Sequence, residues 1–201
     1  MTPAQRPAPP TREADEARLR AMILGTPWLM AALHAARQLE LDAWCIGAGA
    51  VRNAVWDHLH GYHQPSALAD IDVAYFDPAC LEQAQDDALQ ARLQAIAPDA
   101  PWEVSNQAAV HLWFGAYFGH EVPPLRSLEE AVASWPEYAT AVGVRLDKDD
   151  ALRIIAPHGL DDLLAMRIRR NPARVSLETY RARIAQKRYA LRWPRVTINQ
   201  E

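Results

Sequence analysis

The stretch between residues 43 and 77 constrains the fold more than any other part of the chain. It opens on the apolar run AWCIG (43–47), passes through Gly49 into AVRNAVWDHLH (50–60), and ends on the alternating DIDVAYF (70–76). An apolar run closed by glycine indicates a buried strand, an apolar face with a period of 3.6 indicates a helix, and strict alternation indicates a half-buried strand. The stretch therefore predicts a strand–helix–strand unit with a glycine turn.

Two aspartates lie on one face of the second predicted strand. Asp70 and Asp72 are two residues apart, so their carboxylates project together while Ile71 and Val73 enter the core. Two like charges about 7 Å apart repel each other unless a cation lies between them. Because carboxylate, phosphate and water oxygens are the ligands that Mg²⁺ prefers, the pair predicts a site for Mg²⁺ (or Mn²⁺).

The glycine turn before the predicted helix is a candidate phosphate site. The backbone N–H groups of Gly47, Ala48 and Gly49 are expected to approach an anion at the helix N-terminus. Arg52, in the first turn of the helix, is expected to reach a phosphate, and Asn53 lies beside it. Turn, arginine and aspartates would then all bind one ligand, a metal-bound nucleoside triphosphate.

Two other interpretations of this stretch stay open. A Rossmann-like dinucleotide site needs Gly-x-Gly-x-x-Gly and an acid at the end of the second strand. Here the third glycine is replaced by Arg52 or Asn53, and Asp70 begins its strand. The other interpretation is a plain turn followed by a strand whose acids face water.

The rest of the chain predicts an α+β fold with a small mixed β-sheet, flanking helices and helical N- and C-terminal additions. Helices are expected at 13–24, 28–40, 81–97, 127–135, 159–170 and 176–193, a hairpin at 139–147 and 151–157, and a third strand from Trp102 in WEVSNQAAVHLWF, whose later part is ambiguous. We expect a disordered leader at 1–12 and one domain at 13–201, divided into N-terminal helices (13–40), an α+β core (41–156) and a basic helical region (157–201).

Composition narrows the class of protein. The 201 residues are 50% hydrophobic and contain two cysteines, Cys45 and Cys80, in no metal or disulfide pattern. No apolar run approaches the length of a membrane span, so the cytoplasm is the expected location. Residues 167–195 hold ten of the 21 Lys and Arg residues and one acid, Glu178, although the net charge is −4. This basic segment is either a phosphate-facing surface or a solvated helix face, and the acids elsewhere disfavour a general nucleic-acid-binding protein.

The pattern IGAGAVRNAVWDHLHG…ADIDV resembles the opening motif of the nucleotidyltransferase superfamily, which has a polymerase-beta-like fold. It is particularly similar to the tRNA-nucleotidyltransferase and poly(A)-polymerase branch, whose Gly-Gly-x-Val-Arg-Asp matches Gly47 through Asn53 after a one-residue shift. The segments WEVSNQAAVHLWF, AVASWPEYATAVGVR and IAPHGLDDLLAMRIR resemble a compact bacterial branch without an assigned reaction. The chain departs from these patterns in Gly-Ala-Gly, in Asn53 for the acid, in a long loop before Asp70, and in Ala109 where that branch has arginine.

The resemblance implies metal-dependent transfer of a nucleoside monophosphate from a nucleoside triphosphate to an acceptor, with release of pyrophosphate. It also implies a third catalytic and metal-binding carboxylate on a neighbouring strand, for which Glu103 is the candidate. Asn106, Gln107 and His111 follow that strand and are expected to orient a base or acceptor. The acceptor (a small molecule, an RNA end or a protein hydroxyl) and the oligomeric state stay open, as does a non-catalytic nucleotide-binding or interaction module with the same fold.

Overall fold

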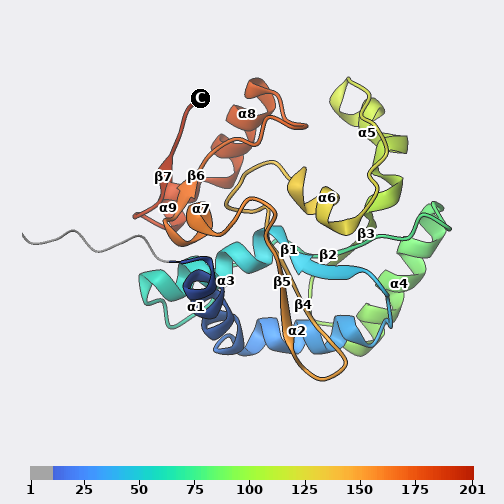
Figure 1. Cartoon of the computed structure of the whole chain (residues 1–201), viewed down its shortest axis with the longest axis horizontal. Helices are drawn as coiled ribbons and strands as arrows, with labels where there is room; N and C mark the ends of the chain where they lie inside the picture. Colours follow the sequence, from blue (N-terminus) through green and yellow to red (C-terminus); the bar gives the residue numbers. More distant parts are fainter. Residues whose placement is uncertain (1–10) are drawn as a thin grey trace, which may run out of the picture.

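The computed structural model describes residues 11–201 and contains a five-stranded sheet surrounded by helices (Figure 1). The strands of this sheet are β1 (Trp44–Gly47), β2 (Ile71–Tyr75), β3 (Trp102–Asn106), β4 (Gly143–Leu146) and β5 (Leu152–Ile155). A separate two-stranded sheet pairs β6 (Arg167–Ile168) with β7 (Thr197–Ile198). The helices are α1 (Arg12–Leu24), α2 (Pro27–Arg37), α3 (Ala48–His60), α4 (Gln83–Ile96), α5 (Val110–Phe118), α6 (Leu128–Ala133), α7 (Asp161–Leu164), α8 (Leu177–Lys187) and α9 (Tyr189–Arg192).

The five strands lie in the order β3-β2-β1-β4-β5. Among the pairs of this sheet, β2 and β3 run parallel, whereas β1 pairs antiparallel with both β2 and β4, and β4 with β5. The predicted α+β fold with a small mixed sheet is confirmed. The parallel register sets Asp72 opposite Glu103, so these two carboxylates lie on the same face of neighbouring strands.

The two faces of the sheet are covered by different helices. Trp44 and Ile46 of β1 belong to the large core, which they share with side chains from α1, α2 and α3. Cys45, which points the other way, packs in a smaller cluster with Leu128 and Val132 of α6. Figure 1 shows α2 on one side of the sheet and α5, α6 and α8 on the other. Cys45 is buried and unpaired, as expected of a small core residue.

Several predicted elements differ from those observed. The helix expected at 159–170 ends at Leu164, and Arg167–Ile168 instead forms β6, because this segment pairs with Thr197–Ile198 at the other end of the C-terminal region. The helix expected at 176–193 is broken at Arg188, which adopts a left-handed φ of 50°. The ambiguous stretch after Asn106 is a 3₁₀ turn followed by α5. Residues 1–10 of the expected leader lie outside the described residues, and α1 already begins at Arg12.

A buried carboxylate fixes the C-terminal helices on the sheet. Glu137 is 0% exposed and accepts hydrogen bonds from Arg183 Nε on α8 (2.6 Å), Thr140 Oγ1 (2.8 Å) and Tyr189 Oη on α9 (3.4 Å). The ion pair with Arg183 balances a charge that would otherwise be costly to bury. The segment between α6 and β4 is therefore joined to both α8 and α9 through one side chain.

We expect Glu137→Ala to lower the free energy of unfolding by about 3 kcal/mol, because it leaves the half-buried Arg183 guanidinium without its counterion. Urea denaturation followed by circular dichroism measures this value. Arg12→Ala is the control, since Arg12 pairs with Glu16 at 2.9 Å but its side chain is 80% exposed. Equal losses in the two variants would contradict the structural role of Glu137.

Candidate functional site

The three predicted carboxylates lie around one part of the sheet. Asp70 directly precedes β2, Asp72 lies within β2, and Glu103 faces Asp72 from β3. Asp72 and Glu103 line a narrow hollow of about 200 Å³, which Ala48 at the start of α3 also lines. Asp70 Oδ1 lies beside Gly49, 3.8 Å from the position that a Cβ on that residue would take. The strand–helix–strand unit and the register of β3 therefore bring the glycine turn and the carboxylates together.

The Asp72 carboxyl is in an environment that disfavours a free negative charge. Burial, and to a lesser extent the nearby Asp70 and Glu103 carboxylates, raise its pKa from 3.8 to about 7, while Lys187 and Arg183 of α8 act in the opposite direction. A cation bound here would relieve the repulsion among these groups.

The donor types of this site suit a hard divalent cation, since all three are carboxylates on one face of two adjacent strands. Within residues 11–201, however, no three His, Cys, Asp or Glu side chains converge closely enough to enclose a metal ion. The carboxylates therefore share a face without closing around one point.

The glycine turn is shaped by a tryptophan. A Cβ on Gly47 would overlap the Trp135 ring and approach Val142 O to 3.1 Å. The Ala48 N–H donates to Val142 O at 3.3 Å, and Ala48 holds a left-handed φ of 48°, which costs a residue with a Cβ about 1 kcal/mol. Gly47 is therefore needed for packing, and the first free N–H groups of α3 begin at Gly49.

Arg52 is enclosed in a cage of aromatic rings. It is 3% exposed, and its guanidinium lies 5.7 Å from the ring of Trp56, 5.0 Å from Tyr189 and 5.3 Å from Trp193. Burial lowers its pKa, and the nearby Tyr189 and the Glu137 carboxylate partly offset this shift. Its Nη2 donates to Asn53 Oδ1 at 2.6 Å. The cage joins α3 to α9, and the contact of Arg52 with phosphate stays a prediction.

The loop before Asp70 is anchored at two consecutive residues. Asp57 Oδ2 and Oδ1 accept from the backbone N–H (2.7 Å) and hydroxyl (2.5 Å) of Ser66, and Asp57 Oδ1 also accepts from Trp193 Nε1 (2.7 Å). The carbonyl of Ala67 accepts from Asn53 Nδ2 at 3.4 Å and from Arg192 Nη2 at 2.6 Å. Asn53, which is 1% exposed, thus holds the loop that carries Asp70.

The three polar residues at the end of β3 and after it have different surroundings. Asn106 is buried, and its amide donates to the carbonyls of Asp77 and Cys80, both at 2.7 Å, which holds the chain after β2. His111 Nδ1 lies 3.0 Å from Ala108 O within its own turn. Of the three, Gln107 lines the cleft between α5 and α8 that is described next, and its Oε1 accepts from Trp135 Nε1 at 3.4 Å.

The narrow hollow opens into a larger cleft of about 720 Å³ between α5 and α8. Asp72 and Glu103 form its floor, aromatic side chains of α5 line one wall, and Arg183 lines both this cleft and the narrow hollow. Neither Arg183 nor the wall of α5 was singled out from the sequence. The signal for Arg183 was the basic segment 167–195, but periodicity alone does not show which of its ten cations faces a carboxylate.

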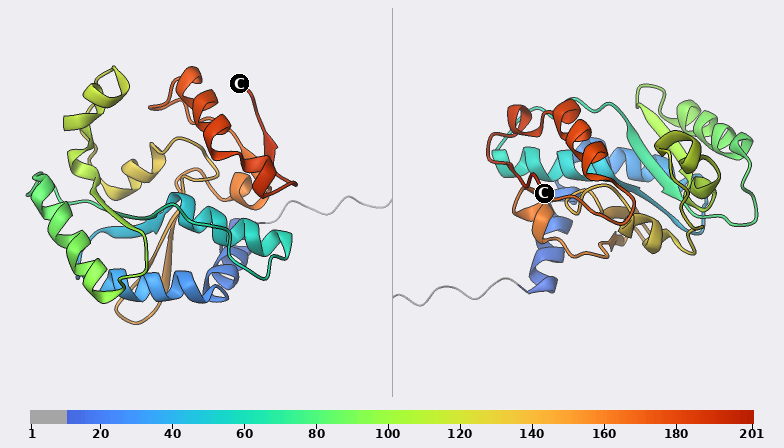
Figure 2. Two further views of the ribbon diagram at one scale, coloured as in Figure 1. Left: turned by 180° about the vertical axis from the view of Figure 1, so that it is seen from behind. Right: turned by 90° about the horizontal axis from the view of Figure 1, so that it is seen from above.

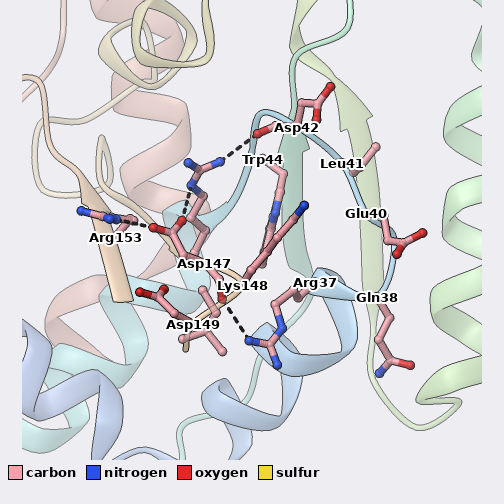
Figure 3. Close-up of a pocket in the computed structure, with 12 residues that line it drawn as sticks. Arg37, Gln38, Glu40, Leu41, Asp42, Trp44, Asp147, Lys148, Asp149 and Arg153 are labelled. Carbon is pink, nitrogen blue, oxygen red and sulfur yellow. Dashed lines mark hydrogen bonds and ion pairs between the residues drawn. The ribbon is translucent and has the colours of Figure 1, made fainter. Parts of the chain in front are cut away.

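A second hollow of about 1180 Å³ lies between the end of α2 and the β4–β5 hairpin (Figure 3). Its arginines are occupied locally: Arg145 and Arg153 both pair with the Asp147 carboxylate, and Arg37 donates to the backbone carbonyl of Asp147 at 3.0 Å. Because the three predicted carboxylates lie elsewhere, this hollow is not the candidate site despite its larger volume.

No helix among the described residues is long and apolar enough to cross a membrane. A family model described as nucleotidyltransferase matches residues 34–198. One similar solved structure, described as a CCA-adding enzyme head domain, shares 28% identity over 91% of this chain and 95% of its own, with a TM-score of 0.77. A second, described as a tRNA-processing enzyme in an apo form, shares 18% identity over 97% of this chain and 46% of its own, with a TM-score of 0.48. No curated protein matches the chain significantly.

We expect Gly47→Ala to destabilise the fold by about 1–3 kcal/mol, because the added methyl group overlaps Trp135. Gly49→Ala is the matched control: its Cβ would lie 3.7 Å from Arg52 Nη2, an ordinary contact, and alanine is favoured over glycine in a helix. Thermal unfolding of the two variants measures the difference. Comparable destabilisation by both would show that Trp135 does not set the glycine requirement.

A pH dependence of stability follows from Asp72. Its pKa is raised from 3.8 to about 7 in the fold, so the stability it contributes is complete below pH 4 and is lost as the pH rises through 7. In EDTA, Asp72→Asn should match the wild type near pH 4 and exceed it above pH 7 by on the order of 2–4 kcal/mol. Urea denaturation across this range measures the difference. A difference independent of pH would contradict the raised pKa.

Proposed function

Given that this chain belongs to the nucleotidyltransferase family, we propose that it transfers a nucleoside monophosphate from a nucleoside triphosphate to an acceptor hydroxyl and releases pyrophosphate. The observation that carries the proposal is the register of β2 and β3, which sets Asp72 opposite Glu103 on the face where Asp70 and the start of α3 also lie. The fold supports it, because the match to the CCA-adding enzyme head domain covers nearly all of both chains.

Asp70, Asp72 and Glu103 would hold a divalent cation, Mg²⁺ or Mn²⁺, because hard carboxylate oxygens suit these ions and because burial and the neighbouring carboxylates, which raise the pKa of Asp72, disfavour its negative charge without a cation. Such an ion, when bound, neutralises phosphate charge and lowers the pKa of an attacking hydroxyl. Rotation of the three side chains would be needed to bring their oxygens around one point.

The triphosphate would lie between the start of α3 and α8. The free N–H groups from Gly49 onwards belong to the N-terminus of α3, a 13-residue helix, and anions are favoured at such a terminus. Arg183 lines the same hollow as Asp72, and its Nε–Glu137 bond fixes the guanidinium while the two Nη groups stay available. We assign the phosphate contact to Arg183 rather than Arg52, because Arg52 is enclosed by three aromatic rings.

The transfer itself forms one bond and breaks one. The acceptor oxygen bonds to the α-phosphorus, the bond from the α-phosphorus to the oxygen bridging to the β-phosphate breaks, and the electron pair leaves with pyrophosphate. The hydroxyl proton passes to water or to a carboxylate of the site. Arg183 would stabilise the negative charge that develops on the leaving pyrophosphate.

A second candidate function is a module that binds the nucleotide without turnover. The observation that favours it is the lack of convergence of three metal-binding side chains in the part of the chain described. A Rossmann-like dinucleotide site is disfavoured, because such a site needs parallel strands around the glycine turn and β1 pairs antiparallel with β2.

Isothermal titration of Mg·ATP against the wild type and Asp70→Ala/Asp72→Ala tests the site. We expect binding to be lost in the double variant, because the metal-binding carboxylates are removed. Arg183→Lys keeps a charge opposite Glu137 but loses the planar fork, so binding should weaken about tenfold, whereas Arg181→Lys on the exposed face of α8 should change nothing.

Release of labelled pyrophosphate from each of the four nucleoside triphosphates, with and without cell extract as acceptor, separates the two candidates. Turnover that depends on Asp70, Asp72 and Glu103 supports the transferase. Metal-dependent binding with no turnover in any of these reactions favours the binding module. Equal Mg·ATP binding by the wild type and the double variant would overturn both.

A further inference from the structure

Helix α5 exposes an unusual number of aromatic rings. Trp113 is 44% exposed, Tyr117 80% and Phe118 41%. The rings contact one another: Phe114 and Phe118 lie 4.5 Å apart, and Trp113 and Tyr117 meet edge-on at 6.4 Å. Large apolar side chains gathered on an exposed surface indicate a binding site, because leaving them in water is unfavourable. They line the 720 Å³ cleft described above, which is of the size that small ligands occupy.

The opposite wall of the cleft is polar and positively charged. It is formed by α8 and by Arg174 in the segment before it, and Figures 1 and 2 show α5 and α8 on the same side of the sheet, facing each other. A flat ring would therefore meet aromatic faces on α5 and polar groups on α8, a combination that favours stacking on one side and hydrogen bonding on the other.

Arg174 lacks an anionic partner. Its Nη2 donates to Pro123 O at 3.0 Å and its guanidinium lies 5.6 Å from the Phe114 ring, but Nη1 has no hydrogen-bond partner and Arg174 makes no ion pair among residues 11–201. Partial burial lowers its pKa, and the Glu130 carboxylate opposes this shift only in part, so the charged form is penalised in the unliganded protein. A bound anion would offset this penalty.

Different residues line the narrow hollow and the wide end of the cleft. Ala48 and the start of α3 lie at the narrow end, and the aromatic wall lies at the other, with Asp72 and Glu103 lining both hollows. A triphosphate held at α3 leaves the wide end for the second substrate. We propose that the cleft between α5 and α8 is the acceptor site and takes a small molecule that carries a flat aromatic ring and an anionic group. Its identification as the acceptor rests on the proposed function, whereas the binding itself does not.

The charge distribution favours a small molecule over a single-stranded RNA end. RNA needs a continuous positive groove, and the chain has a net charge of −4. Many arginines of the basic segment are used internally: Arg167 and Arg169 pair with Asp162, and Arg192 and Arg195 donate to backbone carbonyls. Arg174 and Arg183 are the two cations that line the cleft.

Two fluorescent probes that differ in one anionic group test the site. 1-Anilinonaphthalene-8-sulfonate has flat rings and a sulfonate, and N-phenyl-1-naphthylamine has the same rings without it. Tyr117→Ala should weaken both probes about tenfold, because it removes a stacking face. Arg174→Gln should weaken only the sulfonate, again about tenfold, because it removes the charged donor. Leu112→Ala is the matched control, since Leu112 is 61% exposed on α5 but does not line the cleft.

Several results would overturn the inference. One is equal weakening by Leu112→Ala and Tyr117→Ala. Another is a tighter binding of the sulfonate probe that is absent in the wild type or that persists in Arg174→Gln. A third is competitive displacement of the sulfonate probe by Mg·ATP, which would make the cleft the site of the nucleobase. Tighter binding of a fluorescein-labelled single-stranded RNA that Tyr117→Ala abolishes would replace the small molecule by RNA. A dimer that dissociates on Tyr117→Ala in analytical ultracentrifugation would replace it by a second copy.

The same probes separate this inference from the proposed function. Asp70→Ala, at a residue that does not line the cleft, should weaken Mg·ATP binding and retain the sulfonate probe with unchanged affinity. Retention of both ligands would overturn the proposed nucleotide site and leave the aromatic site standing. Loss of the probe alone in Tyr117→Ala and Arg174→Gln, with Mg·ATP binding intact, is the result expected for a separate acceptor site.

Discussion

The pairing of the buried Glu137 carboxylate with Arg183 is the contact on which the rest of the architecture depends. Glu137 lies in the segment between α6 and β4, and two of its partners, Arg183 and Tyr189, lie on α8 and α9, more than forty residues later in the chain. Tyr189, one of these partners, also supplies a face of the cage around Arg52 on α3. One buried carboxylate thus connects the central helix, the C-terminal helices and a wall of the cleft, and its desolvation is balanced by the three donors around it.

The parts of the fold that depend on local pattern were predictable. The apolar run before Gly47, the helix after it and the alternation around Asp72 each have one clear period, and each forms the predicted element. The pairing of Asp72 with Glu103 was anticipated only through a resemblance, since register depends on the long-range pairing of β2 and β3. Helix α5 was missed because VHLWFGAYF is apolar on nearly every side, so that it has neither a helical nor a strand period.

The roles of single residues in the site were harder to predict than its location. Arg52 follows the glycine turn at a position where a phosphate contact is expected, but Tyr189 and Trp193, which enclose it, lie far away in the sequence. Gly47 looked like a residue for phosphate binding, although the Trp135 ring is sufficient to require it. In both cases the deciding partner is a tertiary aromatic contact, and sequence spacing carries no information about such contacts.

The anchoring of Ser66 and Ala67 has a consequence for the entropy of metal binding. A loop of nine residues between α3 and Asp70 would ordinarily sample many conformations, and a metal that recruited Asp70 would have to restrict them. Asp57, Asn53 and Arg192 already restrict the loop at its sixth and seventh residues. Only Leu68 and Ala69 then separate the anchored residues from Asp70, so Asp70 is preorganised. The long loop before it therefore adds little to the free-energy cost of binding an ion.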